Sequence, residues 1–365
     1  MDFFHTHVSE KAIELATETL RSTFLSEGKR VRQFEEELTR LLALPNPVAV
    51  NSGTSALHLA LEVTGAKQGD EVILPPQTFV ASGLAILMCG ATPVFADIQP
   101  RTGNIDPDSI RAHVTPRTKA IMPVHWGGYP CDMDEINAIA KEHCLAVVED
   151  AAHALGATYK GRPVGTLSRF TAFSFQAIKH LTTGDGGLVC CLDDGDLREL
   201  TRRRWFGIDR ERDKPSILGE RVYDLDVVGY KYHLNDLAAA VGLGNLADLP
   251  TNLARHREIA RRYADRLRNL PGVRLLEEQA DRESSYWLFT ILVERREDFV
   301  RALKSRGVPT SVVHQRIDRN RIMGGVRDGL GGQELFDSMQ IAVPVHVGMT
   351  DADVEAVIRA IVAGW

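Results

Sequence analysis

Between residues 46 and 150, short apolar runs alternate with longer segments in which apolar residues recur at helical spacing. The short runs predict buried β-strands, and the longer segments predict helices that cover them. Because strand and helix alternate, we expect an α/β fold in three layers, a mostly parallel sheet with helices on both faces. The predicted strands are 47–51, 71–74, 92–96, 119–124 and 145–149, and the predicted helices begin at Thr54, Thr78, Asp106 and Asp132.

The rest of the chain predicts helices at the N-terminus and a smaller domain at the C-terminus. Residues 1–45 have the pattern of two amphipathic helices, which would pack on the C-terminal unit or on a partner chain. We expect one large domain over 1–245 and a linking helix with a small α+β domain over 246–365. The remaining predicted elements are a strand at 188–191, a helix from Gly195, a long helix from Asp236 to about Leu270, strands at 286–293 and 310–313, and helices from Glu297 and Asp351.

Composition narrows the class of protein. With 365 residues, 44% of them hydrophobic, the chain can build one large and one smaller core. A net charge of -6 provides no basic field for nucleic acid. The five cysteines are an odd number without CxxC spacing, so we expect reduced thiols, a cytoplasmic location and no metal site. No apolar run is long enough for a membrane span.

Lys179 is the most specific chemical feature. It lies between an aromatic-rich apolar run, 171–178, and a loop of small residues, 181–187. Burying an isolated lysine costs free energy unless its amine is used. One such use is a Schiff base with an aldehyde cofactor, supported by a carboxylate that holds a pyridinium nitrogen. An exposed surface lysine is the alternative, but the neighbouring Phe175 and Ile178 favour burial.

Asp150 would supply that carboxylate. It ends the apolar run 145–149, at the carboxyl edge where open α/β sheets bind ligands. A carboxylate there keeps a pyridinium nitrogen protonated, and a protonated ring withdraws electrons from the reacting carbon. The alternative role is a helix N-cap before Ala151. Together, Lys179 and Asp150 make pyridoxal phosphate the leading cofactor hypothesis.

A strand-to-helix turn offers a phosphate site. Gly53 permits close backbone approach, and Thr54 and Ser55 add hydroxyl and N–H groups at the positive end of the helix dipole. An ordinary turn with an N-cap is the alternative. The turn lacks the P-loop lysine and a G-x-G-x-x-G pattern, which weighs against a triphosphate or dinucleotide. Ser174, five residues before Lys179, is a further candidate, or only one serine in a strand.

Two ring side chains complete the predicted cofactor site. His153 could hydrogen-bond a phenolic oxygen of the cofactor, or be a satisfied polar group at a helix start. Phe79 follows a strand-to-helix turn, where its ring would stack on the pyridine ring or belong to the core.

Together these segments resemble the DegT–StrS family of sugar-nucleotide aminotransferases, fold-type I pyridoxal-phosphate enzymes with an aspartate-aminotransferase-like fold. The resemblance covers nearly the whole chain, and it is specific only when the motifs are taken jointly. The matching segments are 51–57, 69–73 with Thr78 and Phe79, 124–128, 149–153, 174–187 and 229–236.

The resemblance implies a role at each matching position. Lys179 corresponds to the lysine that forms the Schiff base, and Asp150 to the partner of the pyridinium nitrogen. His153 takes the place beside the phenolic oxygen, and Phe79 that of the stacking aromatic. The implied phosphate ligands are Thr54, Ser55 and Ser174.

The resemblance also implies a homodimer with active sites shared across the interface. In many relatives the segment that matches 229–233 comes from the neighbouring subunit, and an asparagine in it reaches the phosphate. This chain has Lys231 at that position, and a lysine can bind phosphate as a point charge. Relatives with histidine in place of Lys179 are dehydratases, so the lysine favours transamination.

The resemblance implies transfer of an amino group from L-glutamate to a nucleotide-linked keto-sugar, most commonly at C4 of a 4-keto-6-deoxyhexose. Amination at C3, a keto-cyclitol acceptor, a sugar dehydratase and a non-catalytic regulatory relative are the alternatives, and the Lys179–Asp150 pair counts against the last two. The nucleotide stays open. Candidates for substrate contacts are Arg204, His233, His314, Arg316 and Arg319, with solvated loop charges as the alternative for the last three.

Overall fold

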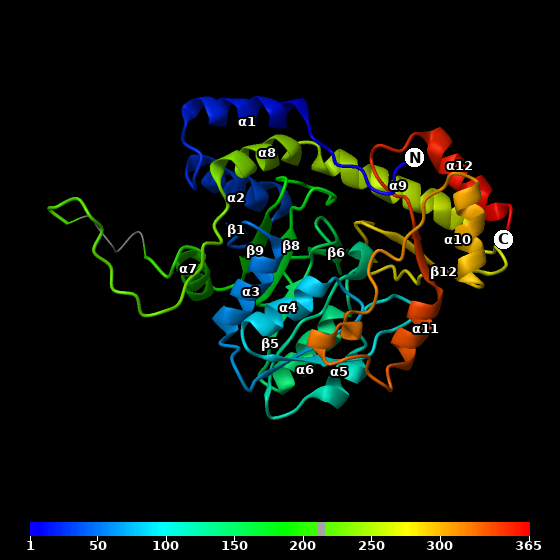
Figure 1. The fold of residues 1–365 in the computed structure, drawn as a ribbon, viewed down its shortest axis with the longest axis horizontal. Coiled ribbons are helices and arrows are strands. Elements are labelled where there is room, and N and C mark those ends of the chain that lie inside the picture. Colours follow the sequence, from blue (N-terminus) through cyan, green and yellow to red (C-terminus); the bar gives the residue numbers. More distant parts are fainter. Residues whose placement is uncertain (210–215) are drawn as a thin grey trace.

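The computed structural model describes residues 1–209 and 216–365 and is built around a seven-stranded sheet (Figure 1). The strand order is β1-β9-β8-β5-β4-β2-β3, and within it only β9 runs antiparallel to its neighbours. The predicted α/β fold with a mostly parallel sheet is therefore confirmed. The strands are β1 (Val48–Val50), β2 (Glu71–Leu74), β3 (Thr92–Phe95), β4 (Thr118–Ile121), β5 (Ala146–Asp150), β8 (Phe170–Ser174) and β9 (Gly187–Cys191).

Helices cover both faces of this sheet, so its strands are buried on both sides. In β5, for example, Val147 belongs to the core under α2, α6 and α8, and Val148 to the core under α3, α4 and α7. This explains why the strands are continuous apolar runs rather than alternating ones. The helices are α2 (Lys29–Leu42), α3 (Gly53–Thr64), α4 (Val80–Met88), α5 (Pro107–His113), α6 (Met133–Glu142), α7 (Asp194–Arg203) and α8 (Asp236–Leu246).

The N-terminal helices α1 (Glu10–Ser22) and α2 pack on α8 at one edge of the molecule (Figure 1). Gly244 of α8 permits this close approach, because a Cβ atom there would lie 2.2 Å from the Cα atom of Ala12. The segment before α1 reaches the C-terminal unit, where the ring of Phe4 stacks on Trp287. The two helices pack mainly on α8 and do not wrap around that unit, and a contact with a partner chain stays a prediction.

The expected long helix from Asp236 to Leu270 is wrong, because the structure has two helices there. The first, α8, ends at Leu246, and α9 (Leu249–Leu267) begins three residues later. Pro250, in the first turn of α9, has no N–H to donate to the carbonyl of Leu246, so one continuous helix is disfavoured.

The C-terminal unit has its own antiparallel sheet, β10-β12-β13, and its own core, which includes Tyr263, Phe299 and Ile358. The predicted strand at 310–313 is wrong, because only Ser311 forms an isolated bridge, to Ala342. The domain boundary at 245 stays a prediction. The elements are β10 (Val273–Leu275), β12 (Phe289–Val293), β13 (Gln340–Val343), α10 (Arg296–Ser305), α11 (Gly331–Met339) and α12 (Asp351–Val362).

Short elements connect the two units. A small sheet has the order β11-β6-β7 and joins a loop of the large sheet to the C-terminal unit. Among the described residues, no helix combines the length and the apolar character that a bilayer span requires. The short elements are β6 (Thr158–Tyr159), β7 (Arg162–Pro163), β11 (Arg282–Glu283) and the 3₁₀ turns Trp126–Gly128, Ile317–Arg319 and Arg321–Met323.

Candidate active site

A cavity of about 380 Å³ lies at the carboxyl edge of the sheet, between the starts of α3 and α4, the ends of β5 and β8, and the loop after β8. Parallel strands place their carboxyl ends at one edge, so residues far apart in the chain meet there. The predicted residues that line this cavity are Gly53, Thr54, Phe79, Asp150, His153, Ser174, Lys179 and His314.

Lys179 lies in the turn that follows β8, in which its N–H donates to the carbonyl of Gln176. Its Nζ atom is 3.5 Å from the centre of the Trp287 ring. Burial lowers the pKa of Lys179 to about 7, although the charge of Asp150 acts in the opposite direction. Near neutral pH much of this amine is unprotonated, as a nucleophile and a proton carrier require.

Asp150 ends β5 and is held by two donors. The hydroxyl of Ser82 donates to its Oδ2 atom at 2.7 Å, and the N–H of Ala152 donates to Oδ1 at 3.1 Å. Burial raises the pKa of Asp150, and these hydrogen bonds oppose the rise. No helix begins at Ala151 in the described chain, so the N-cap alternative is wrong.

The turn before α3 presents the N-terminus of a helix to the cavity, a geometry that suits an anion. Gly53 begins the helix, and a Cβ atom there would lie 3.0 Å from the Cβ atom of Ser174, so only glycine allows this approach without a shift. Thr54 and Ser174 line the cavity beside the helix N-terminus. Ser55 is placed differently: its hydroxyl donates to Asn51 at 2.6 Å, and its side chain does not line the cavity.

Aromatic rings form one wall of the cavity. His153 stacks on Trp287 at 3.9 Å between ring centres, and on His314 at 5.6 Å. Burial lowers the pKa of both histidines, that of His314 to about 4, so both are neutral at pH 7. The Nδ1 atom of His153 and the Nε2 atom of His314 have no hydrogen-bond partner among the described residues. Phe79 is 53% exposed at the rim, so it is not a core residue.

Trp287 and Ser82 are functional candidates that the sequence analysis missed. The indole N–H of Trp287 donates to the carbonyl of Ile178, 109 positions away in the chain, so no local pattern reveals it. Ser82 lies one helical turn after Thr78 and bonds to its hydroxyl at 2.7 Å, and this spacing could have indicated a shared face.

Arg204 is not a substrate contact, contrary to the sequence prediction. Its guanidinium is buried, and it donates to Glu35 at 2.6 Å, to Glu27 at 2.9 Å and to the carbonyl of Ala49 at 2.9 Å. These partners join α7 to β1 and to the segment around α2, which is a structural role.

Replacing Arg204 with alanine should therefore destabilise the protein by about 3–5 kcal/mol, because two partly buried carboxylates lose their cation. Urea unfolding at pH 7 measures this free energy. Arg202→Ala is the matched control, since Arg202 is more exposed in its pairs with Glu199 and Asp226 and should cost about 1 kcal/mol or less. Unchanged stability together with weaker substrate binding would contradict the structural role of Arg204.

The other cationic candidates also lie outside the cavity. Arg316 is buried and forms two hydrogen bonds with Asp318, at 2.7 and 2.6 Å, so its guanidinium is already neutralised and the predicted contact is wrong. Arg319 pairs with Asp337 at 2.7 Å and does not line the cavity. Of the five substrate candidates, the structure brings only His314 to the catalytic cavity.

The segment with Lys231 and His233 packs beside β1. His233 forms a bridge to Val50, and Lys231 places its Nζ atom 3.8 Å from the centre of the Trp205 ring. Neither residue lines the cavity of its own chain. A role for Lys231 in a partner's site stays a prediction.

A cluster on α3 and after α4 contains possible metal ligands. His58, Glu62 and Cys89 bring ligand atoms within 4.8 Å of one another. Arg203 pairs with Glu62 at 3.4 Å, and the hydroxyl of Tyr232 lies 3.2 Å from Nδ1 of His58. Burial, reinforced by Glu62, raises the pKa of the Cys89 thiol to about 12. These contacts tie α3 to the segment around Tyr232, and the expected absence of a metal stays a prediction.

The fold and this site define a pyridoxal-phosphate-dependent enzyme of fold-type I. A sequence profile of the DegT/DnrJ/EryC1/StrS aminotransferase family matches residues 6–362, and the chain belongs to this family. It is a sugar aminotransferase, as the relatives described next also indicate.

Two curated relatives and two solved structures illustrate the similarity. The chain is 39% identical to the spore coat polysaccharide biosynthesis protein SpsC of Bacillus subtilis, over 97% of this chain and 94% of the relative. It is 35% identical to GDP-perosamine synthase of Caulobacter vibrioides, over 94% and 92%. The sugar aminotransferase CalS13 of Micromonospora echinospora superposes with a TM-score of 0.95 at 35% identity, over 100% of both chains. The pyridoxal-phosphate form of Spr1654 of Streptococcus pneumoniae, described as a putative sugar aminotransferase, superposes with a TM-score of 0.92 at 29% identity, over 100% and 98% of the two chains.

The residues of the cavity fit pyridoxal phosphate. Lys179 would bind the aldehyde carbon, Asp150 the ring nitrogen, and the Gly53 turn with Thr54 and Ser174 the phosphate. The unpaired Nδ1 atom of buried His153 offers a hydrogen bond to the ligand. The cofactor is thus supported both by this site and by the relatives.

The lowered pKa of Lys179 predicts how cofactor capture depends on pH. Below about pH 7 the amine is protonated and cannot add to a carbonyl, and above it the amine is neutral. The association rate of pyridoxal phosphate with cofactor-free protein, followed by visible absorbance, should therefore rise through about pH 7 and then level off. Because the charge of Asp150 raises this pKa, Asp150→Asn should move the rise to lower pH. A midpoint near the ordinary lysine value of 10.5 would contradict the prediction.

Proposed function

We propose that this sugar aminotransferase takes its amino group from L-glutamate and transfers it to a keto-sugar carried by a nucleoside diphosphate. The preferred acceptor position is C4 of a 4-keto-6-deoxyhexose. The observation that carries the proposal is Lys179, an amine with a pKa of about 7 in a cavity that also contains Asp150. The similarity to a GDP-perosamine synthase supports a nucleotide-linked acceptor.

Lys179 is the proton carrier of the proposed reaction. When bound, pyridoxal phosphate supplies the carbonyl that receives the amine and the ring that withdraws electrons from the reacting carbon. With the cofactor bound, the neutral Nζ atom of Lys179 would take the proton from the α-carbon of glutamate and hold it for return to the reacting group. With the keto-sugar the direction reverses, and Lys179 places a proton on the sugar carbon that receives nitrogen.

Asp150 and the ring wall prepare the cavity for this proton transfer. Asp150, held by Ser82 and Ala152, supplies the negative charge that keeps the cofactor's ring nitrogen protonated. Trp287 and His153 exclude water from one side of Lys179. The neutral imidazole of His314 can hydrogen-bond a sugar hydroxyl without adding charge.

A substrate panel tests the proposed acceptor. The holoenzyme with glutamate is incubated with the 4-keto-6-deoxyhexoses of thymidine, uridine and guanosine diphosphate, with a 3-keto isomer, and with a free keto-cyclitol. Product NMR should show a new amine at C4 of a nucleotide-linked sugar. Turnover of the keto-cyclitol alone would replace the proposal with its principal alternative.

We further propose that the enzyme is a homodimer in the cytoplasm, in which each subunit completes the site of its partner. The segment 216–228 projects from the body of the subunit (Figure 1) and exposes apolar side chains that a partner would cover. Its exposed apolar residues are Ile217, Leu218, Val222, Tyr223, Leu225 and Val228. Lys231 follows this segment directly, within reach of the same interface.

Mixing two inactive variants tests the shared site. Lys179→Ala and Lys231→Ala subunits are unfolded together, refolded as a mixture and assayed at low cofactor concentration. Random pairing yields about half mixed dimers, each with one intact site, so about a quarter of the wild-type activity should return. Mixing without any gain, although mixed dimers form, would show that Lys231 does not act across the interface.

A further inference from the structure

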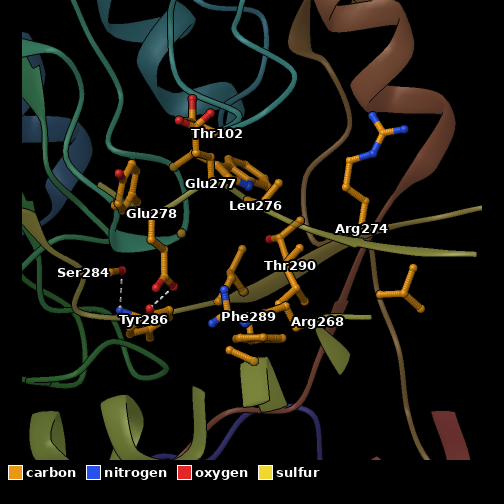
Figure 2. Close-up of a pocket in the computed structure, with 17 residues that line it drawn as sticks. Thr102, Arg268, Arg274, Leu276, Glu277, Glu278, Ser284, Tyr286, Phe289 and Thr290 are labelled. Carbon is orange, nitrogen blue, oxygen red and sulfur yellow. Dashed lines mark hydrogen bonds between the residues drawn. The ribbon is translucent and has the colours of Figure 1, made fainter. Parts of the chain in front are cut away.

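A second cavity, of about 560 Å³, lies between the C-terminal sheet and loops of the large domain (Figure 2). The end of α9 and strands β10 and β12 line it on one side, and the segments around Thr102 and Trp126 on the other. Among the described residues, it shares no lining residue with the cavity around Lys179. It is therefore a separate site, not an extension of the catalytic one.

Two buried polar groups in its wall are unpaired. The indole N–H of Trp126 and the hydroxyl of Thr290 have no hydrogen-bond partner among the described residues, and their side chains are only 1% and 6% exposed. An unpaired buried donor costs free energy, so groups of this kind are rare without a ligand or a water. Both residues line the cavity, and each has a hydrogen-bond donor that the described protein leaves unpaired.

Arginine side chains without an ion pair among the described residues lie at the same cavity. Neither Arg268 nor Arg274 is within ion-pair distance of an acidic group in the described chain. The acidic neighbours have other contacts: Glu277 pairs with Arg101 at 3.0 Å, and Glu278 accepts a hydrogen bond from Tyr286. Figure 2 shows Arg268 on the same side of the cavity as Thr290 and Phe289. A guanidinium beside a free donor is suited to a carboxylate.

The remaining walls are apolar, with Leu276, Leu288 and Phe289 among them. We propose that this cavity binds a small organic carboxylate with an apolar body. Its carboxylate lies on Arg268, its apolar part packs on the two leucines and the phenylalanine, and an acceptor atom pairs with Thr290 or Trp126.

The ligand is an effector rather than a substrate, because two tryptophans separate it from Lys179. Trp126 lines this cavity, and its ring centre is 6.1 Å from those of His153 and His314 in the catalytic cavity. Tyr286 and Leu288 line the second cavity, while Trp287 between them covers Lys179. Tyr286 also has a positive φ of 51°, a strained backbone that is disfavoured unless its surroundings hold it.

Ligand-detected NMR on the holoenzyme tests the proposal with a matched pair of probes, 4-phenylbutyrate and the neutral 4-phenylbutanol. The acid should bind about tenfold more tightly than the alcohol, because only the acid pairs with arginine. Arg268→Gln and Thr290→Val should each weaken binding of the acid about tenfold. Arg261→Gln is the control, since Arg261 is an exposed arginine of α9 that does not line the cavity.

Thr290→Val has a second readout that separates binding from folding. Valine has the shape of threonine without the unpaired hydroxyl, so the melting temperature of the ligand-free protein should stay the same or rise. If this variant fails to fold, the exposed Arg268→Gln variant still decides the question. Equal binding of acid and alcohol, no binding of the acid, or binding unaffected by Arg268→Gln would overturn the proposal.

Discussion

Replacing Lys179 with alanine should abolish the visible absorbance of the covalently bound cofactor and reduce transamination by at least ~10³-fold. The variant loses the nucleophile that captures the cofactor and the base that moves the proton, and each role contributes orders of magnitude to the rate. The measurements are the absorbance spectrum with pyridoxal phosphate, with and without glutamate, and the rate of amine transfer.

Two variants separate this chemical role from charge and from folding. Lys179→Arg keeps a cation next to Trp287 but should be as inactive as Lys179→Ala, because a guanidinium is not a nucleophile at neutral pH. Lys160→Ala, which removes a surface lysine paired with Asp134, should remain fully active. In the cofactor-free protein, removing the amine of Lys179 should not lower the melting temperature, since burying that amine costs free energy. Wild-type turnover in Lys179→Ala would show that the assigned lysine is wrong.

Replacing Asp150 with alanine should retain weak cofactor binding but reduce the turnover number by about 10²–10³-fold. Without the carboxylate, the ring nitrogen loses the charge that keeps it protonated, and the reacting carbon loses electrostatic stabilisation. Asp150→Asn should be nearly as slow, because it keeps the volume and loses the charge. The turnover number at saturating cofactor, with the cofactor dissociation constant measured separately, gives both quantities.

Ser82→Ala tests the role of the Asp150 carboxylate more mildly, because it removes one hydrogen bond to the carboxylate and leaves the carboxylate in place. Ser82 touches Asp150 but has no assigned contact with the cofactor, so its loss should cost only about tenfold in rate. Ser82→Thr, which keeps the hydroxyl, should recover part of that loss. A rate unaffected by Asp150→Ala would remove the role assigned to Asp150.

Much of the fold was predictable because its signals are local. The predicted strand 71–74 is β2 residue for residue, and Asp106 caps α5 through a hydrogen bond from the N–H of Asp108 at 3.1 Å. The predicted strand at 310–313 failed because apolar residues in that segment pack without forming a ladder. The break before α9 was missed because its only local signal is Pro250.

In the candidate site, too, local signals were predictable and long-range contacts were not. Lys179, Asp150 and Gly53 each follow a strand or lie at a strand-to-helix turn, and the sheet brings such positions to one edge, so the sequence alone predicted that these residues meet. The role of an arginine depends on partners elsewhere in the chain. Arg204 donates to Glu35, 169 positions away, and this contact gives it a structural role that the sequence did not indicate.

The sequence by itself thus predicted the family, the α/β fold and the lysine–aspartate pair, because short segments of consecutive residues indicate each of them. Only the tertiary structure decided that Arg204 and Arg316 form ion pairs with carboxylates, that Trp287 covers Lys179, and that Thr290 and Trp126 line a second cavity. Long-range packing sets which charges are neutralised and which polar groups stay unpaired, and no local pattern of residues records that outcome.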